Sequence, residues 1–367
     1  MLETSEIITK AKAIGFDDVV IAPVEPVGAG WYAPHAERVK DWVAQGEHAD
    51  MQWMEARLGE RIVPASLLPN VCSAIVLWMN HRTRRPARPE GQIGRVAAYA
   101  WGRDYHNVVR KAVRKLERWM FEVEPALRRY ISIDTGAVLE RSFGERGALG
   151  WIGRSTMLIH QKLGTFGSIA VIFVAHPLEP SSVQGHPNRC GRCTDCITAC
   201  PTNALSDGRL DARLCISYWT IEHRGIIPAD IRPMLGEWVF GCDICQDVCP
   251  WNNKAPDADE TVWRPKPDHV WPDLVAWLNQ SSEALHEQLL GSPLRRAGGA
   301  GLRRNALVVL ANMGQYDALP TIKTLATSDP DPVIRATAVW AARQLGDVSV
   351  IDAALKDPDP RVRLEAN

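Results

Sequence analysis

Eight of the nine cysteines lie between Cys190 and Pro250, and their spacing constrains the fold more than any other feature. The first four follow a C-x2-C-x2-C-x3-C-P pattern, and a second block, from Cys242 to Pro250, ends in the same C-x3-C-P run. A loop with two residues between cysteines wraps three corners of a cubic iron–sulfur cluster before the chain must turn away. The stretch is therefore predicted to bind two [4Fe–4S] clusters.

The fourth cysteine of each such motif faces away from its own cluster. In bacterial two-cluster ferredoxins it binds the other cluster, and here Cys215 takes the place of a first cysteine that an insertion has displaced upstream. One cluster is then expected on Cys190, Cys193, Cys196 and Cys249, and the other on Cys200, Cys215, Cys242 and Cys245. The ninth cysteine, Cys72, lies in an apolar run and is predicted to be a core residue.

Other uses of the cysteines explain the pattern less well. Zinc needs only C-x-x-C pairs, which leaves the C-x3-C-P endings unexplained. Disulfides need an oxidising compartment, and nothing else in the sequence indicates one. An aspartate or histidine in place of one thiolate remains an alternative, although eight cysteines match the eight iron corners of two cubes.

Length and charge set broad limits. A chain of 367 residues is long enough for two or three domains. No apolar run reaches the roughly 20 residues of a membrane span, and the N-terminus lacks a signal sequence, so a cytoplasmic protein without a membrane partner is expected. The net charge is -1, so a nucleic-acid partner would have to meet a local basic patch.

Hydrophobic patterning predicts three parts, with an α+β class for the first of them. Residues 1–176 alternate helices with apolar strands, which indicates an N-terminal α/β domain. Residues 177–260 hold the cysteines and are predicted to be ferredoxin-like. The helices are expected at 5–15, 34–45, 105–130 and 139–150, and the strands at 16–24, 73–79, 94–101, 131–136, 157–160 and 168–175.

The third part, residues 261–367, reads as a Pro-rich linker followed by an all-α repeat. Similar segments recur at 302–307, 334–339 and 362–366, two of them after Asp-Pro-Asp-Pro. A period of about thirty residues with a basic residue early in each second helix favours HEAT-like helical pairs. We expect them to form a small docking platform.

Two clusters within electron-transfer distance imply an electron acceptor, and the large N-terminal domain is the expected place for it. A flavin, a corrinoid or a bound substrate would each serve, while the absence of a G-x-G-x-x-G fingerprint argues against a nicotinamide. Asp104-Tyr105-His106 begins like the D-x-H-x-x-G motif that supplies a cobalt ligand, but the glycine is missing. His106 is therefore not assigned to cobalt.

Several motifs resemble the epoxyqueuosine reductase family over nearly the whole chain. The most specific is C-I-S-Y-W-T-I-E-H at 215–223, a block that the reductive dehalogenases, which share the general layout, do not have. The other matching segments are Gly241-Cys242-Asp243, Cys249-Pro250-Trp251-Asn252, Asp104-Tyr105-His106, Leu139-Glu140-Arg141 and Leu149-Gly150-Trp151-Ile152-Gly153.

This resemblance implies a cobalamin-dependent two-electron reduction of epoxyqueuosine to queuosine at the wobble position of tRNA. The two clusters would feed cob(I)alamin from an external low-potential electron donor, and a monomer is expected. Asp134 matches the proton donor of the family, and a donor at neutral pH needs a raised pKa, which burial against the corrin could supply. The alternative is that Asp134 only caps the turn that follows it.

The resemblance also implies binding residues. For cobalamin these are Arg57, Tyr99, Asp134, Ser155, Thr156, Ser217 and His223. The sequence departs from the family where Gly153-Arg154-Ser155-Thr156 stands in place of Gly-Lys-Asn-Thr, which puts contacts specific to lysine or asparagine in doubt. For tRNA the candidates are Arg224, Lys254, Arg295, Arg296, Arg303, Arg304 and Asn305, each of which is alternatively part of a solvated helix face. The arginine-rich loop at 81–95 is either a phosphate-binding loop or solvated.

Two rival functions remain open from the sequence. One is an electron-transfer or scaffold protein whose helical repeat docks a redox partner. The other is a corrinoid enzyme that acts on a free small molecule. A corrin absorption spectrum separates the first from an enzyme, and turnover of epoxyqueuosine in tRNA separates the second.

Overall fold

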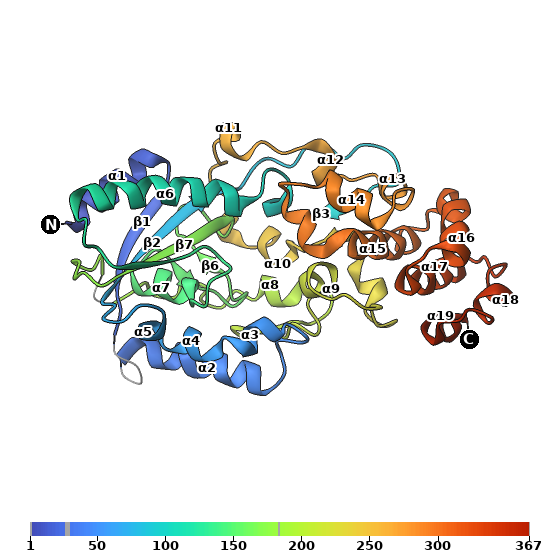
Figure 1. Ribbon diagram of the computed structural model, residues 1–367, viewed down its shortest axis with the longest axis horizontal. Coiled ribbons are helices and arrows are strands. Elements are labelled where there is room, and N and C mark those ends of the chain that lie inside the picture. Colours follow the sequence, from blue (N-terminus) through green and yellow to red (C-terminus); the bar gives the residue numbers. More distant parts are fainter. Residues whose placement is uncertain (1, 26–29, 183, 367) are drawn as a thin grey trace. The chain divides into compact units, whose positions relative to one another are not determined.

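The computed structural model describes residues 2–25, 30–182 and 184–366 (Figure 1). It divides into two compact units, each assembled from several segments of the chain. Unit 1 comprises Met1–Thr83, Tyr105–Arg213 and Ile244–Trp263, and unit 2 comprises Arg84–Asp104, Leu214–Asp243 and Arg264–Asn367. Whether segments 1–176, 177–260 and 261–367 act as domains stays a prediction. Among the described residues, no helix is both long enough and apolar enough to span a membrane.

A four-stranded antiparallel sheet with strand order β1-β2-β7-β4 forms the centre of unit 1. The strands are β1 (Asp18–Pro23), β2 (Ser73–Asn80), β4 (Arg129–Ser132) and β7 (Gly167–Val174). Ile75 of β2 pairs with Ile21 on one side and with Ile172 on the other, which fixes the register of the three longest strands. Every residue of β2 is buried, because helices cover both faces of the sheet.

Alternate residues of each strand enter two separate cores. Ile21 packs with Leu116 of α6 (Tyr105–Val123) in one of these cores. Figure 1 shows α6 and α1 (Thr4–Ile14) lying side by side over the sheet. Val20 packs with Phe143 of α7 (Glu140–Arg146) on the opposite face, together with part of α2 (Ala33–Ala44). The predicted mixed architecture of helices and sheet is confirmed.

The remaining elements of unit 1 are short. They are α3 (Gln52–Ala56), α4 (Leu58–Ile62), α5 (Pro64–Leu67), α8 (Asp195–Thr198), α10 (Ile244–Asp247) and α11 (Glu260–Trp263), with the hairpins β5 (Trp151–Ile152) with β6 (Leu158–Ile159) and β8 (Leu205–Ser206) with β9 (Arg209–Leu210). The helix predicted over 105–130 ends at Val123, because Pro125 disfavours a helical conformation for Glu124. The residues after Pro125 can therefore leave the helix and form β4.

Unit 2 is mostly helical and is built around α15 (Gly298–Asn312), in which Leu302 and the nine residues that follow are all buried. Its only strands within the described residues are β3 (Arg95–Val96) and β10 (Trp238–Phe240), which pair in parallel. Its other helices are α9 (Ile216–Ile221), α12 (Pro267–Val270), α13 (Leu274–Leu278), α14 (Ser282–Gln288), α16 (Leu319–Ser328), α17 (Pro332–Gln344), α18 (Ile351–Ala354) and α19 (Pro360–Ala366). The predicted all-α end of the chain is confirmed. The strand predicted over 94–101 is only two residues long.

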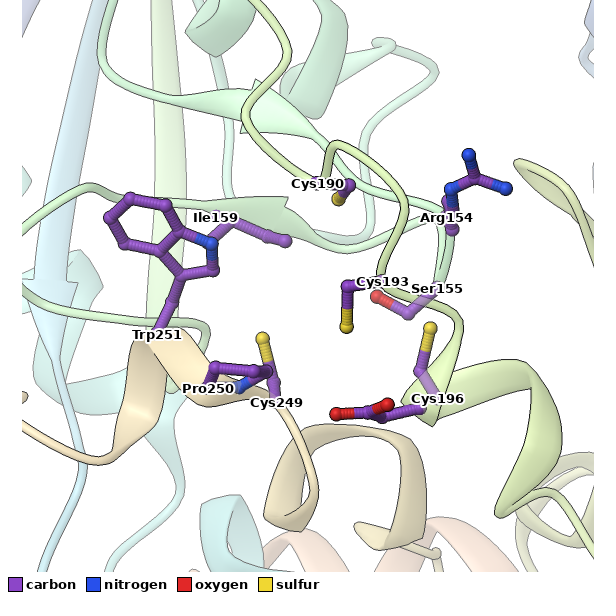
Figure 2. A pocket seen from close by; sticks show the side chains of 10 residues that line it. Arg154, Ser155, Ile159, Cys190, Cys193, Cys196, Cys249, Pro250 and Trp251 are labelled. Atoms are coloured by element: carbon purple, nitrogen blue, oxygen red, sulfur yellow. The ribbon is translucent and has the colours of Figure 1, made fainter.

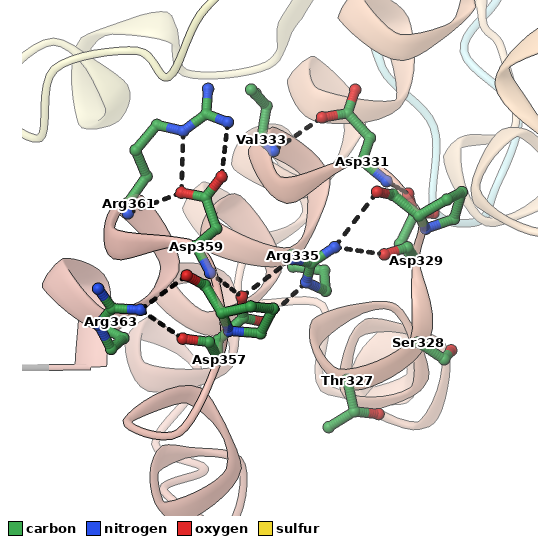
Figure 3. A network of polar contacts seen from close by, with 12 residues as sticks. Thr327, Ser328, Asp329, Asp331, Val333, Arg335, Asp357, Asp359, Arg361 and Arg363 are labelled. Atoms are coloured by element: carbon green, nitrogen blue, oxygen red, sulfur yellow. Dashed lines mark hydrogen bonds and ion pairs between the residues drawn. The ribbon is translucent and has the colours of Figure 1, made fainter.

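The two Asp-Pro-Asp-Pro loops before α17 and α19 are held by the same contact (Figure 3). Arg335 donates to the carbonyl oxygens of Asp329 and Pro330 at 2.8 and 3.3 Å. Arg363 makes the equivalent contacts, at 2.6 and 2.9 Å, with the loop that begins at Asp357. The arginine early in each second helix therefore closes the loop that leads into its own helix.

Arginines also join one repeat to the next. The Arg335 guanidinium pairs with the Asp357 carboxylate at 2.7 Å, and Arg303 of α15 pairs with Asp329 at 2.6 Å. The side chains of Arg303 and Asp329 are only 4% and 3% exposed, so water does not screen this pair. The basic positions that mark the repeat in the sequence thus have a structural role.

Arg303→Ala is expected to lower the free energy of unfolding by about 3 to 5 kcal/mol, because it leaves the Asp329 carboxylate buried without its cation. Arg361→Ala serves as the control, since the Arg361 side chain is half exposed and its pair with Asp359 should contribute little to stability. Thermal melts of both variants measure the difference, and equal shifts in melting temperature would contradict this role of Arg303.

Candidate functional site

Asp134 lies in a tight turn directly after β4 whose backbone is held from α7. Its φ of +61° is a left-handed conformation that is uncommon for a residue other than glycine. The Glu140 carboxylate accepts hydrogen bonds from the Asp134 backbone N–H at 2.8 Å and from the Ser132 hydroxyl at 2.7 Å. Gly136 is required next to them, since a Cβ there would lie 2.2 Å from the Ser132 Oγ. The left-handed backbone conformation of Asp134 is therefore stabilised by its neighbours.

The Asp134 carboxylate is 59% exposed and is contacted by the first residues of α6. The Tyr105 hydroxyl donates to its Oδ2 at 2.5 Å, and the His106 Nε2 lies 3.4 Å from the same atom. Partial burial tends to raise the pKa of Asp134, but the close contact with His106, the hydrogen bond from Tyr105 and the charges of His106 and Arg141 outweigh it, so the pKa lies below its usual value. This direction is opposite to the one expected for a proton donor.

Glu140 differs from Asp134 in its acidity. Burial, followed by the negative charge of Asp134, raises the pKa of Glu140 to about 7. The two carboxyl groups interact, so the proton belongs to the pair rather than to one residue. Between the low pKa of Asp134 and about pH 7 the pair therefore carries one proton and one negative charge.

A second strained turn connects Asp134 to the cysteines. Arg141, one residue after Glu140, donates to the carbonyl oxygen of Thr156 at 2.9 Å. Thr156 has a φ of +64°, which is an outlier for a β-branched residue. The preceding residue, Ser155, is buried and lines the cysteine pocket described next. A strained backbone persists only where the surrounding structure holds it in place, and such residues cluster at functional sites.

Four of the cysteines line one pocket of about 390 Å³, open solvent included. Figure 2 shows the thiol groups facing a common space, three from the first cysteine block and the fourth after α10. They are Cys190, Cys193, Cys196 and Cys249, the set predicted for one cluster. Within the described residues, no group of three or more His, Cys, Asp or Glu side chains is placed so that it could hold a single metal ion. The pocket and its four thiols fit a cluster.

The surroundings of these thiols fit metal-bound thiolates. Burial raises the pKa of Cys196 and of Cys249, and the neighbouring thiols raise both further, so ionisation of the set requires a compensating positive charge such as iron provides. The Trp151 indole N–H donates to the Cys190 sulfur at 3.4 Å. The Trp151 ring also packs edge-on against Trp251, with the ring centres 4.7 Å apart.

The other four cysteines are divided between the units. Cys245 lies in α10 and Cys200 follows α8, and these two helices pack against each other in unit 1. Cys215 precedes α9 and Cys242 follows β10, which pack together in unit 2. The binding of a second cluster by this set stays a prediction.

The residues expected to bind cobalamin are likewise divided. Asp134, Ser155 and Thr156 are described above. Arg57 also belongs to unit 1, where it pairs with Glu60 and hydrogen-bonds Tyr130 of β4. Three others belong to unit 2. Tyr99 lies with its ring centre 6.0 Å from that of Phe240, Ser217 is in α9, and the His223 ring stands edge-on to Trp219 at 4.7 Å.

Arg303, Arg304 and Asn305 are buried and engaged inside unit 2, so the expectation that they contact tRNA is corrected. Arg304 donates to the carbonyl oxygens of Trp219 and His223 at 2.7 and 2.8 Å. The amide of Asn305 likewise donates to backbone carbonyls. These side chains donate to backbone carbonyl oxygens in and around α9. They can do so because they lie on α15, a helix without an exposed face.

The remaining basic candidates lie at or near the surface. Arg224 donates to the carbonyl oxygen of Ala297 at 2.9 Å, and Arg296 pairs with Glu222 at 2.7 Å. Lys254 is exposed and Arg295 is partly buried. In the arginine-rich loop, Arg88 pairs with Glu237 and Arg95 stacks on Trp238. Fewer arginines of this loop are therefore available to bind phosphate than its composition suggests.

Four residues of the site carry a role that reasoning from the sequence missed: Tyr105, Glu140, Arg141 and Trp151. Each lies inside a motif that carries the family resemblance. The motifs thus marked the right segments, but a pattern of residues does not say which atom donates to which.

The comparisons with known proteins agree with this geometry. Three families match: "Epoxyqueuosine reductase QueG, DUF1730" over residues 61–135, "4Fe-4S double cluster binding domain" over 189–252, and "HEAT repeats" over 288–367. The epoxyqueuosine reductase of Pseudomonas aeruginosa is 37% identical, with 92% of each chain covered. That of Xanthomonas campestris is 35% identical, covering 93% of this chain and 96% of the relative.

Solved structures give the same result. A crystal structure of epoxyqueuosine reductase with an epoxyqueuosine-modified tRNA-Tyr stem loop has a TM-score of 0.90 at 29% identity, covering 99% of this chain and 96% of that chain. The enzyme from Bacillus subtilis, in a structure with its catalytic aspartate loop swung out of the active site, has a TM-score of 0.88 at 28% identity over 99% of this chain and 96% of that chain.

The side-chain carboxyl of Glu140 is expected to titrate with a midpoint near pH 7, because burial and the charge of Asp134 favour its protonated form. Carbon-13 NMR of protein labelled at the glutamate carboxyl carbons measures this, and Glu140→Gln identifies the resonance by its loss. A midpoint in the ordinary range of about 4 to 5 would show that Glu140 holds no proton near neutrality.

Cys249→Ser is expected to lose about half of the iron that the reconstituted wild-type protein binds, because it removes one ligand from one of two four-thiolate sets. Cys72→Ser is the control, since the Cys72 sulfur lies outside both sets, 3.8 Å from the Val174 carbonyl oxygen. Iron analysis after anaerobic reconstitution measures both variants. Full iron content in Cys249→Ser would argue against the assignment.

Proposed function

This chain belongs to the epoxyqueuosine reductase family, and we propose that it reduces the epoxide of epoxyqueuosine to give queuosine at the wobble position of tRNA. The reaction takes up two electrons and two protons, removes the epoxide oxygen as water and leaves a carbon–carbon double bond. The protein must therefore bring together a source of electrons, a source of protons and the modified nucleotide.

One observation carries the proposal. Within unit 1, the Asp134 turn and the pocket of Cys190 are connected through two consecutive contacts, from Arg141 to Thr156 and from Ser155 to the pocket. In this proposal the electron carrier and the carboxyl group are held by residues of unit 1 that are linked through these contacts. This pairing supports a reduction coupled to proton delivery.

The cysteines bind the electron carriers in this proposal. Cys190, Cys193, Cys196 and Cys249 hold one [4Fe–4S] cluster, and Cys200, Cys215, Cys242 and Cys245 hold the other. An external low-potential donor supplies electrons to a monomeric enzyme. Low-potential clusters suit the task because the reduced corrinoid is difficult to generate.

The residues near Asp134 fit a large polar cofactor. Arg61 is 5% exposed and donates to the Gly136 carbonyl oxygen at 3.2 Å, yet its Nε has no hydrogen-bond partner among the described residues. When bound there, cobalamin would supply a strongly reducing cobalt centre. The proposed binding residues are Arg57, Asp134, Ser155 and Thr156 of unit 1 and Tyr99, Ser217 and His223 of unit 2.

Asp134 delivers a proton to the oxygen that leaves the epoxide. Its carboxylate is ionised in the open structure, where it faces water. A cofactor and a substrate that cover it would remove that water and raise its pKa, and Glu140 keeps a proton in the pair up to about pH 7. Tyr105 orients the carboxylate, and Glu140 fixes the backbone beneath it.

Asp134→Asn tests this role. The variant is expected to keep the iron–sulfur and corrin absorption spectra and to lose about 10²- to 10⁴-fold in rate, because an amide cannot deliver the proton. The assay is anaerobic, with an epoxyqueuosine-modified anticodon stem-loop, cobalamin and a chemical reductant, and mass spectrometry detects the loss of one oxygen atom.

Asp352→Asn, an exposed carboxylate in α18, is the control and should keep full activity. Full activity of Asp134→Asn would remove Asp134 from the mechanism. A wild-type protein that binds iron and cobalamin but does not turn over the modified RNA would overturn the proposed function.

A further inference from the structure

The outer face of α6 carries a row of cations that neither the sequence motifs nor the proposed site includes. Five basic residues lie within nine positions of this helix, and all are exposed: Arg110, Lys111, Arg114, Lys115 and Arg118. None of the five has a hydrogen bond or an ion pair with any described residue, which distinguishes them from the paired arginines elsewhere. We call this set the α6 basic stripe.

The helix geometry gathers these cations on one side. Successive residues turn by about 100°, so Arg110, Arg114 and Arg118 follow one another at steps of about 40°, with the two lysines along the same flank. The opposite side is apolar, and Val113 and Leu116 are buried against the sheet. Figure 1 shows α6 lying along the outside of the sheet of unit 1. The stripe therefore faces away from the core.

Acidic side chains do little to neutralise the stripe. On α6 itself, Glu117 is already paired with Arg129 at 2.8 Å, and Glu122 lies beyond the last cation. The protein as a whole has a net charge of -1, so this concentration of positive charge is local. It would attract a partner with a regular row of negative charges.

The same helix begins at the candidate acid. Tyr105, its first residue, donates to the Asp134 carboxylate, and the stripe starts five residues later. At a rise of 1.5 Å per residue, Arg110 lies about 8 Å along the helix axis from Tyr105, and the stripe continues for about 12 Å more. A polymer whose reacting unit sits at Asp134 can thus lay its neighbouring charges along α6.

We propose that the α6 basic stripe binds the phosphate backbone of the RNA stem that adjoins the modified nucleotide. This inference rests on the proposed function for the identity of the RNA, while the charge complementarity rests on the structure alone. Arginine and lysine side chains at this position neutralise phosphates without reading bases, so the stripe adds affinity and orientation but no sequence preference.

The test variant is Arg110→Gln/Arg114→Gln/Arg118→Gln, which keeps the helix because glutamine is a good helix former. Fluorescence anisotropy with an unmodified anticodon stem-loop RNA, over a series of salt concentrations, measures Kd. We expect Kd to rise about ten- to hundredfold at 0.1 M salt and the slope of log Kd against log salt to fall by about 2 to 3.

The matched control is Arg38→Gln/Lys162→Gln/Lys356→Gln, which removes the same charge from exposed positions outside α6. Its Kd should stay within about threefold of wild type. An unchanged salt slope in the α6 variant, or an equal loss in the control, would overturn the proposal. Circular dichroism melts of both variants verify that folding is intact.

A turnover assay separates this proposal from the proposed function. With epoxyqueuosine-modified RNA, the α6 variant should show a raised KM and an unchanged kcat, since Asp134 and the cysteines are untouched. If wild-type protein binds the unmodified stem-loop through the stripe but reduces nothing, the proposed function fails and the RNA-binding face stands. If turnover is normal and the α6 variant matches wild type in KM and Kd, only the stripe is wrong.

Discussion

Four thiols that face one space repel one another once they ionise, and burial makes each charge costlier still. Cys196 and Cys249 show both effects, since burial and the neighbouring sulfurs raise the pKa of each. The raised pKa values favour the protonated thiols, and positive charge such as that of iron would favour the thiolates. A cluster bound here would tie the first cysteine block to the residues after α10, which are distant in the sequence, and Ser155 lines the same pocket.

The candidate acid depends on a different kind of support. An aspartate after a strand is ordinarily exposed and free to move. In Asp134, however, the backbone N–H is held by Glu140 and the carboxylate is held by Tyr105. The pKa values of the two carboxyl groups shift in opposite directions, because burial and the charge of Asp134 dominate at Glu140, whereas contacts with His106 and Tyr105 and the charge of Arg141 outweigh burial at Asp134. The proton that the pair holds near neutrality would then be available to Asp134, whose carboxylate stays exposed.

The sequence predicted the mixed class of helices and sheet, most element positions and four cysteines that line one pocket, because these follow from local spacing and periodicity. It misjudged elements where one residue outweighed the pattern, as where Pro125 ended the helix expected to reach 130. It also assigned Arg303 to RNA, since a basic residue on a helix looks the same in a sequence whether it meets water or a buried partner such as Asp329. The role of Glu140 depends on a contact with the backbone of Asp134, which no residue pattern encodes.

The indole of Trp151 has a consequence for the energy of the electron itself. Its N–H points at the Cys190 sulfur, and reduction of a cluster adds negative charge to its sulfurs. A donor in that position favours the reduced form, so the cluster it touches accepts an electron more readily than an identical cluster without such a donor. A tryptophan outside the ligand set would then help to set the reduction potential of a cluster held by Cys190, and so to decide where the electron rests.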